Sequence, residues 1–324
     1  MSLRQDLVDA TTGAEVDYNV VNWQAQLTST IHRDLYPLLD PYKNTDLAVG
    51  AAGKIVLITG ATGGIGRKIA EAWVVAGAAG VVITGLEADK LKNEESRLRT
   101  ISKAQNQDRP EVRILSHQAD STDESSVSSL WTTASQKLGR IDVLVNCAGS
   151  LTVQKIGQGS SLDIWKHYET NIKGPMLMIH HFLNQPGFTG GTVIGVTTGI
   201  LGETYPNFAS YIPSKLAAAK YMEYLHAEEP SVRCFNLVPG LVATEMAPPG
   251  YMDFARDDPM LTGGLSLLLC TERAEWLRGG LVSVNWDWEE MEQHKDEIVE
   301  KGLIKLGFTN AKFGKGGHPW AEQP

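Results

Sequence analysis

The sequence is poor in cysteine and in basic charge, and each shortage excludes a class of protein. Its 324 residues include only three cysteines, Cys147, Cys234 and Cys270, which are too few and too scattered for a disulfide framework or a metal-ligand cluster. Lys and Arg number 29 against 38 Asp and Glu, so a net charge of −9 leaves no basic surplus to neutralise nucleic-acid phosphates. We therefore expect a protein of a reducing compartment, with no metal and no nucleic-acid partner.

Membrane and export signals are also lacking. No apolar run approaches the roughly 20 residues that a membrane-spanning helix needs. The N-terminal stretch MSLRQDLVDATTGAEVDYNV does not have the basic-then-apolar layout of a signal peptide. From these two observations we expect a cytoplasmic location and no membrane partner.

What the sequence does contain is a regular alternation of short apolar runs and longer amphipathic stretches. Runs rich in Val, Ile and Leu, with little polar alternation, lie at 55–59, 81–84, 112–115, 141–146, 192–196, 232–238 and 281–284. Such runs are typical of parallel strands that are covered on both faces, and the stretches between them are typical of helices. The pattern predicts an α/β protein: a doubly wound Rossmann fold with a seven-stranded parallel sheet in a single domain.

Two flanks fall outside this alternation. The stretch DLYPLLDPYKNTDLAVGAAGK, rich in Asp, Pro and Gly, predicts an extended arm leading into the first strand. After residue 285, acids alternate with apolar positions, which predicts a surface helix, and a Gly- and Pro-containing tail is expected to be poorly ordered. We therefore divide the chain into an arm (1–52), a dinucleotide-binding and catalytic domain (53–287), and a C-terminal helix and tail (288–324).

A glycine-rich turn follows the first apolar run, in KIVLITGATGGIGRKIA. Gly60, Gly64 and Gly66 stand between a predicted strand and a predicted helix, where a side chain would block the close approach of a pyrophosphate. The start of the helix also offers unpaired N–H groups and the positive end of its dipole. A glycine triplet alone means little in a chain with 32 glycines, but its strand-turn-helix context favours dinucleotide binding.

A tyrosine and a lysine stand four positions apart in SYIPSKLAAAKY. On a helix, Tyr211 and Lys215 share a face, with Ser210 as the expected N-cap and Pro213 in the first turn. An ammonium beside a phenol favours the phenolate and so lowers the pKa of the tyrosine toward neutrality. Taken alone, such a pair is more often a solvated helix face than a catalytic site.

Three segments together resemble the signatures of the classical short-chain dehydrogenase/reductase family: TGATGGIG (59–66), NCAG (146–149) and YIPSK (211–215). They stand in the order and approximate spacing of that family, and the likeness covers residues 53–287. The segments LRGGLVSVNWD (277–287) and LYPLLDP (35–41) further resemble a fungal branch of it. The resemblance implies an NAD(P)(H)-dependent oxidoreductase that passes hydride between a nicotinamide and a carbonyl or secondary alcohol, most simply a ketone reductase.

The resemblance also implies four catalytic residues. Tyr211 would be the general acid and base, and Lys215 would lower its pKa and hold the ribose. Thr198 stands where the family usually has serine; it keeps the hydroxyl and adds a methyl group, and the adjacent Thr197 is the weaker alternative. Asn171, in YETNIKG, would hold a water that links Lys215 to solvent. The plainer alternatives are a strand-end threonine and a locally paired helix asparagine.

A set of cofactor contacts is implied in the same way. The glycine turn and NCAG would let the chain approach the dinucleotide closely, Asp120 would contact the adenine amine, and NLVPGLVATEM would grip the nicotinamide carboxamide. A helix cap and an ordinary proline turn are the alternatives for the last two. The expected contacts are Gly60, Thr62, Gly64, Ile65, Gly66, Gly85, Leu86, Asp120, Ser121, Asn146, Ala148, Gly149, Tyr211, Lys215, Pro239, Gly240, Val242 and Thr244.

The end of the second strand bears on the choice of cofactor. In the family, an acid there excludes a 2′-phosphate, and an arginine at the next position accepts one; this chain has Gly85 and Leu86. Because the acid is missing, NADP(H) is favoured, with Arg67 as a further source of positive charge. Glu87 points the other way, so NAD(H) stays possible.

The segment EMAPPGYMDFARDDPML (245–261) lies where the family builds its substrate lid. Its apolar side chains suggest an apolar small-molecule substrate, although a loop can equally pack such residues against itself: Met246, Tyr251, Met252 and Phe254. The helix at 211–228 and the one holding Asn171 resemble those with which the family forms dimers and tetramers, so a homodimer or homotetramer is expected.

Two alternatives to a ketone reductase stay open. The first keeps the fold and redirects the chemistry, as an epimerase, dehydratase or imine reductase. The second is a dinucleotide-binding sensor or scaffold without turnover. Only the threonine at position 198 favours the second, whereas the intact Tyr211, Lys215 and Asn171 speak against it.

Overall fold

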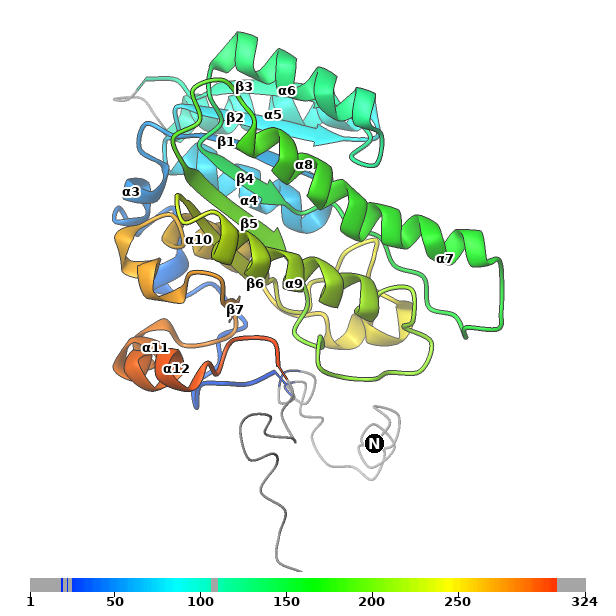
Figure 1. Cartoon of the computed structure of the whole chain (residues 1–324). Helices are drawn as coiled ribbons and strands as arrows, with labels where there is room; N and C mark the ends of the chain where they lie inside the picture. The colour runs from blue at the N-terminus through cyan, green and yellow to red at the C-terminus, as the bar shows by residue number, and fades with distance from the viewer. Residues whose placement is uncertain (1–18, 20–21, 23–24, 106–109, 308–324) are drawn as a thin grey trace, which may run out of the picture.

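Seven strands form one parallel sheet at the centre of the protein. The computed structural model describes residues 19, 22, 25–105 and 110–307. Figure 1 shows the strands at the centre of the protein, between the helices. In chain order the strands are β1 (Ile55–Thr59), β2 (Gly80–Gly85), β3 (Arg113–Gln118), β4 (Val143–Asn146), β5 (Gly191–Val196), β6 (Val232–Val238) and β7 (Leu281–Ser283). Their spatial order is β3-β2-β1-β4-β5-β6-β7, which confirms the predicted Rossmann fold with a seven-stranded parallel sheet.

The order of the strands indicates where a ligand would bind, at the carboxyl ends of the central strands. The chain winds outward from β1 to β3 on one side, and from β4 to β7 on the other. β1 therefore lies between β2 and β4, with Leu57 paired to Val82 and to Leu144. In an open parallel sheet, ligands bind outside the carboxyl ends of the strands where the winding reverses.

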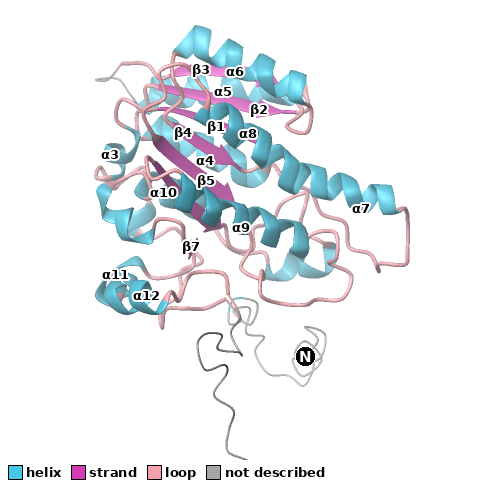
Figure 2. Cartoon of the chain, viewed as in Figure 1, coloured by secondary structure: helices cyan, strands magenta, loops and turns pink. Residues whose placement is uncertain are grey.

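Helices cover both faces of the sheet, as Figure 2 shows. One layer holds α4 (Gly64–Val75), α5 (Ala88–Gln105) and α10 (Met260–Leu268); the other holds α6 (Glu124–Leu138), α8 (Gly174–Leu183) and α9 (Ile212–Glu228). The first layer packs around the fully buried Trp73, whose indole nitrogen donates to Ser266 Oγ at 3.0 Å. The second packs around the buried Phe182. The continuous apolar strands are thus buried on both sides.

The segment before β1 is not the extended arm that its Asp, Pro and Gly content predicts. Its described part contains a 3-10 helix, η2 (Pro37–Leu39), and the helix α3 (Leu47–Ala51). Leu39 and Leu47 are each only 1% exposed, because the apolar residues between the turn-forming ones pack into the core beside α10. Residues 1–18 lie outside the described residues.

The C-terminal segment also differs from the expected surface helix. It forms two short helices, α11 (Trp288–Gln293) and α12 (Lys295–Lys301), that meet at His294 after the 3-10 helix η5 (Glu272–Leu277). Trp288 and Ile298 are buried, because the apolar positions between the acids pack into the core. The tail from residue 308 lies outside the described residues, and the division at 52/53 and 287/288 stays a prediction.

The described part of the chain contains no helix long and apolar enough to cross a membrane. Within the same residues, no group of three or more His, Cys, Asp and Glu side chains is arranged to hold a metal ion.

Candidate active site

Tyr211 directly precedes helix α9, and Pro213 lies in the first turn of that helix as expected. Ser210 is not the N-cap: it is buried, and its hydroxyl donates to the carbonyl of Thr152 at 2.8 Å. The carbonyl of Phe208 instead accepts from the backbone N–H groups of Tyr211 and Ile212, both at 3.0 Å. The preceding turn therefore satisfies donors that a side-chain cap normally takes.

Lys215 is buried and Tyr211 is half-buried, so the pair does not lie on a solvated helix face. The Nζ atom of Lys215 lies 6.0 Å from the centroid of the Tyr211 ring and donates to the carbonyl of Val196 at 2.9 Å. Burial lowers the pKa of Lys215 to about 8 and raises the pKa of Tyr211 to about 12. The expected lowering of the tyrosine pKa is therefore wrong for this arrangement, because burial outweighs every other influence on the phenol.

Thr198 lies just beyond the end of β5, beside Tyr211. Its hydroxyl hydrogen-bonds the phenol, which opposes the upward shift of the Tyr211 pKa. The neighbouring Thr197 is buried, and its Oγ1 has no hydrogen-bond partner among the described residues. Both threonines border the same cavity as Tyr211, which is described below. The structure therefore offers two candidate hydroxyls near the phenol.

Asn171 stands in a π-helical turn, Glu169–Lys173, between α7 (Ser161–Tyr168) and α8. Its side-chain amide accepts from the N–H of Ser150 and donates to the carbonyl of the same residue, both at 2.9 Å. It also donates to Ser214 Oγ at 2.9 Å, and that hydroxyl donates to the carbonyl of Tyr211 at 2.7 Å. Asn171 thus joins the loop after β4 to the start of α9, and such single π turns are common at functional sites.

Glycines keep this region open to a ligand. A Cβ atom at Gly149 would lie 3.2 Å from Lys215 Nζ and 3.3 Å from Asn171 Oδ1, so a side chain there would crowd both. Gly60 has a φ of +64°, and a Cβ there would lie 2.8 Å from the Cα of Ala148. The turn after β1 and the NCAG segment therefore pack backbone to backbone, which requires glycine at position 60.

A cleft runs along the carboxyl ends of β1, β2 and β4. It is bordered by Gly60, Thr62, Gly64, Ile65, Gly66, Gly85, Leu86, Asp120, Ser121, Ala148, Gly149, Tyr211, Lys215, Pro239 and Thr244. Three expected cofactor contacts lie elsewhere. Gly240 and Val242 border the neighbouring cavity, and Asn146 faces a small space beside Asn171, with its buried Nδ2 lacking a partner in the described chain.

Sequence reasoning alone does not single out Thr59, the last residue of β1. Its Oγ1 accepts from the backbone N–H groups of Cys147 and Ala148, both at 3.0 Å. This hydroxyl holds the NCAG turn against the glycine turn. The signal was available, because Thr59 is the first residue of the TGATGGIG segment.

Asp120 lies in the cleft and does not cap a helix. Its Oδ1 accepts from the N–H and the hydroxyl of Thr122, both at 2.8 Å. Asp123 is the N-cap of α6 and accepts from the N–H of Ser126 at 2.7 Å. The helix-cap alternative for Asp120 is therefore wrong.

The charges at the end of β2 are largely paired. Arg67 borders the cleft, and its Nε donates to Glu94 at 2.8 Å. Glu87 forms an ion pair with Lys90 at 2.7 Å. A Cβ atom at Gly85 would lie 3.2 Å from Thr62 Oγ1, so this edge of the cleft has little room for a side chain.

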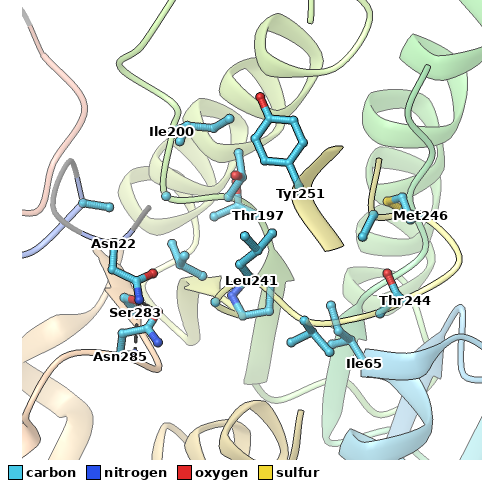
Figure 3. A pocket seen from close by; sticks show the side chains of 18 of the residues that line it. Asn22, Ile65, Thr197, Ile200, Leu241, Thr244, Met246, Tyr251, Ser283 and Asn285 are labelled. Carbon is cyan, nitrogen blue, oxygen red and sulfur yellow. Dashed lines mark hydrogen bonds between the residues drawn. The ribbon is translucent and has the colours of Figure 1, made fainter. Parts of the chain in front are cut away.

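A second, mostly apolar cavity adjoins the cleft, and Figure 3 shows it from close by. Tyr211, Thr244 and Pro239 border both spaces. The ring of Phe208 packs edge-on against Tyr205 and Tyr251, with centroids 6.3 and 6.0 Å apart. Such an aromatic group offers flat apolar surface to a ligand.

The lid expectation is met by two of its four side chains. Met246 and Tyr251 border the cavity. Met252 is 43% exposed on the 3-10 helix η4 (Pro249–Phe254), and Phe254 is buried in the protein. Of the two roles that the sequence left open, Met246 and Tyr251 are placed to contact a ligand, and Phe254 packs inside the protein.

A Rossmann sheet with a half-buried tyrosine and a buried lysine, where a cleft meets an apolar cavity, defines a dinucleotide-dependent type of oxidoreductase site. The chain belongs to the short-chain dehydrogenase family, whose family model matches residues 54–251. It is 34% identical over 265 residues to the short chain dehydrogenase andI of Emericella variicolor, an alignment that covers 78% of this chain and 89% of the relative.

Further comparisons agree with this assignment. The chain is 31% identical over 294 residues to the short chain dehydrogenase pigC of Monascus ruber, covering 87% of this chain and 93% of the relative. Both relatives are fungal, which confirms the expected branch. An alcohol dehydrogenase from Thermococcus sibiricus, solved with 5-hydroxy-NADP, has a TM-score of 0.61 at 24% identity over 72% of this chain and 96% of that one, which supports the fold.

Proposed function

We propose that this protein is an NADP(H)-dependent reductase of an apolar ketone, or a dehydrogenase of the corresponding secondary alcohol. One observation carries the proposal: Tyr211, hydrogen-bonded to Thr198, borders both the cleft along the strand ends and the apolar cavity. A proton donor at that junction can reach a substrate oxygen whose carbon faces a ligand in the cleft.

The residues of the cleft fit a dinucleotide. Helix α4 has Gly63 as its N-cap and no side-chain cap, so its first N–H groups lack a side-chain acceptor of the kind that usually satisfies them. Such groups at a helix start, beside glycines, are suited to phosphate. A Cβ atom at Gly64 would lie 2.8 Å from the Thr244 methyl, so a side chain there would force Thr244 to shift. When bound, the nicotinamide supplies or accepts the hydride.

The protein groups would move and hold the proton. With its pKa raised to about 12, Tyr211 is protonated at neutral pH and can donate a proton to the oxygen of a carbonyl under reduction, but it is a weaker acid than a tyrosine whose pKa lies near the working pH. Thr198 would stabilise that oxygen and orient the phenol. Lys215 would hold the ribose, and Asn171 would position the start of α9 and hold the water of a proton relay.

NADP(H) is the proposed cofactor, with NAD(H) as the alternative. Neither Gly85 nor Leu86 carries an acid that would repel a 2′-phosphate, and this absence supports the preference. Arg67 borders the cleft, but its charge is offset by Glu94 at 2.8 Å. The charge of Glu87 is offset by Lys90 at 2.7 Å.

Absorbance of the reduced nicotinamide, followed over a panel of ketones and alcohols, tests the reaction. The variant Tyr211→Phe should lower NADPH-linked reduction by about 10²- to 10⁴-fold and leave cofactor affinity almost unchanged. Tyr224→Phe is the matched control, because Tyr224 is exposed on the same helix. Equal turnover by wild type and Tyr211→Phe would discard the proposed acid. Cofactor binding without turnover on any substrate would favour a sensor.

We further propose a homodimer or homotetramer in the cytoplasm. Apolar side chains are exposed on the outer helices at Met176 and Leu216. Such residues are suited to a helix-mediated interface between copies. Light scattering of the purified protein tests the assembly, and a monomer at all concentrations would reject it.

A further inference from the structure

One wall of the apolar cavity comes from the chain before the Rossmann fold. Asn22, Ala25, Gln26 and Ile31 border the cavity together with the lid. Asn22 and residues 25–33 are called the arm segment below. Figure 3 shows Asn22 on one side of the cavity and Met246 on the other. The region that matches the family begins only at residue 54, so this wall is an addition to the family framework.

The arm segment is fixed to the residues that directly follow β7, the last strand of the sheet. Ile31 forms an antiparallel bridge with Trp286, whose indole nitrogen donates to the carbonyl of Ala25 at 2.6 Å. The backbone N–H of His32 donates to the carbonyl of Asn285 at 2.8 Å, and Asn285 Nδ2 donates back to the carbonyl of His32 at 2.9 Å. The wall is thus held by specific hydrogen bonds.

A buried carboxylate connects the arm segment to the turn beside Tyr211. Asp257, whose side chain is completely buried, pairs with Arg33 and accepts from Asn285 Nδ2 at 3.1 Å. The same carboxylate accepts from the N–H of Leu241 at 2.6 Å, which fixes the turn after β6. Because Leu241 borders the cavity, one ion pair positions two of its walls.

Asn22 is a polar group in this wall with an unmet hydrogen-bonding need. It is 8% exposed, and its Nδ2 is buried with no partner among the described residues. Figure 3 shows its side chain on the same side of the cavity as Ser283 and Asn285. Burying an unpaired amide N–H costs free energy that a ligand oxygen can recover.

We propose that the arm segment is a substrate-recognition element, and that Asn22 hydrogen-bonds an oxygen on the substrate body, away from the carbonyl that Tyr211 protonates. Most of the remaining lining is apolar or aromatic, which suits a ring system, and the polar side chains of Ser283 and Asn285 lie on the same side as Asn22. The ligand class is therefore a ring-containing ketone, or its alcohol, that carries a second hydroxyl or carbonyl oxygen. That the substrate's carbonyl group lies at Tyr211 rests on the proposed function.

Substituted 1-tetralones test this contact. The kcat/KM of the full-length protein with NADPH is measured for 1-tetralone and for its 5-, 6- and 7-hydroxy derivatives. We expect a preference for at least one hydroxylated ketone, and Asn22→Leu should reduce that preference about tenfold, the worth of one hydrogen bond to a buried group. Asn22→Ala repeats the test if the leucine variant does not fold. Leu27→Ala is the matched control, because Leu27 is an exposed residue of the same segment outside the cavity lining.

A change of the preference by Asn22→Leu but not by Leu27→Ala supports the assignment. No preference in the wild type, or an equal change for all four ketones, overturns it. Calorimetry of the same ketones with the Tyr211→Phe protein and NADP⁺ separates this inference from the proposed reaction, because it measures binding without turnover. If tetralones bind with an Asn22-dependent preference but are never reduced, the reaction fails and the recognition element stands.

Discussion

The buried Lys215 and the half-buried Tyr211 lie one helical turn apart, with the ammonium nitrogen 6.0 Å from the centre of the phenol ring. The ammonium donates to the carbonyl of Val196 at 2.9 Å. Burial moves both groups toward their neutral forms, since it lowers the pKa of Lys215 to about 8 and raises that of Tyr211 to about 12. In this arrangement the loss of solvation disfavours charge on either residue.

This burial predicts a pH-dependent stability that Lys215→Met removes. The pKa of Lys215 is about 8 in the folded chain against 10.5 for a lysine exposed to water, so the unfolded chain binds more protons between these values and the wild type gains stability as pH rises. From pH 7 to 10 the gain is about 2 kcal/mol. Tyr211 acts in the opposite direction only above pH 10, where the unfolded chain loses its phenolic proton first.

Denaturant unfolding of the cofactor-free wild type and Lys215→Met at several pH values checks this. Other ionisable groups cancel in the difference between the two proteins. The advantage of the methionine variant should shrink by about 2 kcal/mol between pH 7 and 10. Parallel stability curves over that range would mean that the ammonium is solvated in the folded chain.

Thr198 should act through its hydroxyl and not through its methyl group. Because the hydroxyl hydrogen-bonds the Tyr211 phenol, Thr198→Val should lower kcat by about 10²-fold, the scale of one lost hydrogen bond to a developing oxyanion. Thr198→Ser keeps the hydroxyl and should stay within a few-fold of the wild type. Steady-state kinetics with a ketone substrate decide this, and full activity of the valine variant would transfer the role to Thr197, which has a buried free hydroxyl in the described structure.

The strands could be predicted from the sequence because each is an apolar run. The run at 55–59 coincides with β1, which is buried along its whole length. β3 extends three residues beyond its predicted end, through Ser116, His117 and Gln118. It is an edge strand, so these residues pair with β2 while their polar side chains stay partly exposed, and hydropathy cannot detect them.

The site could be predicted only as far as its short motifs extend. Tyr211 and Lys215 were within reach because they belong to one short motif, whereas Thr198 was implied only by the family resemblance. Ser210 fails as the N-cap because its hydroxyl is taken by Thr152, which lies 58 residues earlier in the chain. The wall built from the arm segment depends on pairings such as Ile31 with Trp286. Hydrophobic periodicity reports only on residues close in the sequence, so it cannot predict a contact between residues so far apart.

Gly85→Asp should reverse the cofactor preference. A carboxylate at the end of β2 would repel a 2′-phosphate and accept hydrogen bonds from free ribose hydroxyls. Fluorescence titration should show NADPH binding weakened by about tenfold or more, while NADH binding strengthens relative to it. Gly85→Ala controls for crowding, since any Cβ atom there lies 3.2 Å from Thr62 Oγ1. Tighter NADH binding by the wild type would contradict the proposed NADP(H) preference.

The Arg33–Asp257 pair predicts that a single change in the arm segment disturbs the cavity. Arg33→Met leaves the buried carboxylate of Asp257 without its cation, which should lower the free energy of unfolding by about 3–5 kcal/mol. Arg99→Met is the control, because Arg99 is 43% exposed in its ion pair with Glu95, and its loss should cost about 0–1 kcal/mol. Since Asp257 also holds the N–H of Leu241, the Arg33 variant should raise KM for ketones while NADPH affinity changes little. Denaturant unfolding and steady-state kinetics measure the two effects. A destabilised variant with an unaltered KM would show that the Arg33–Asp257 pair stabilises the fold without positioning the cavity for substrate.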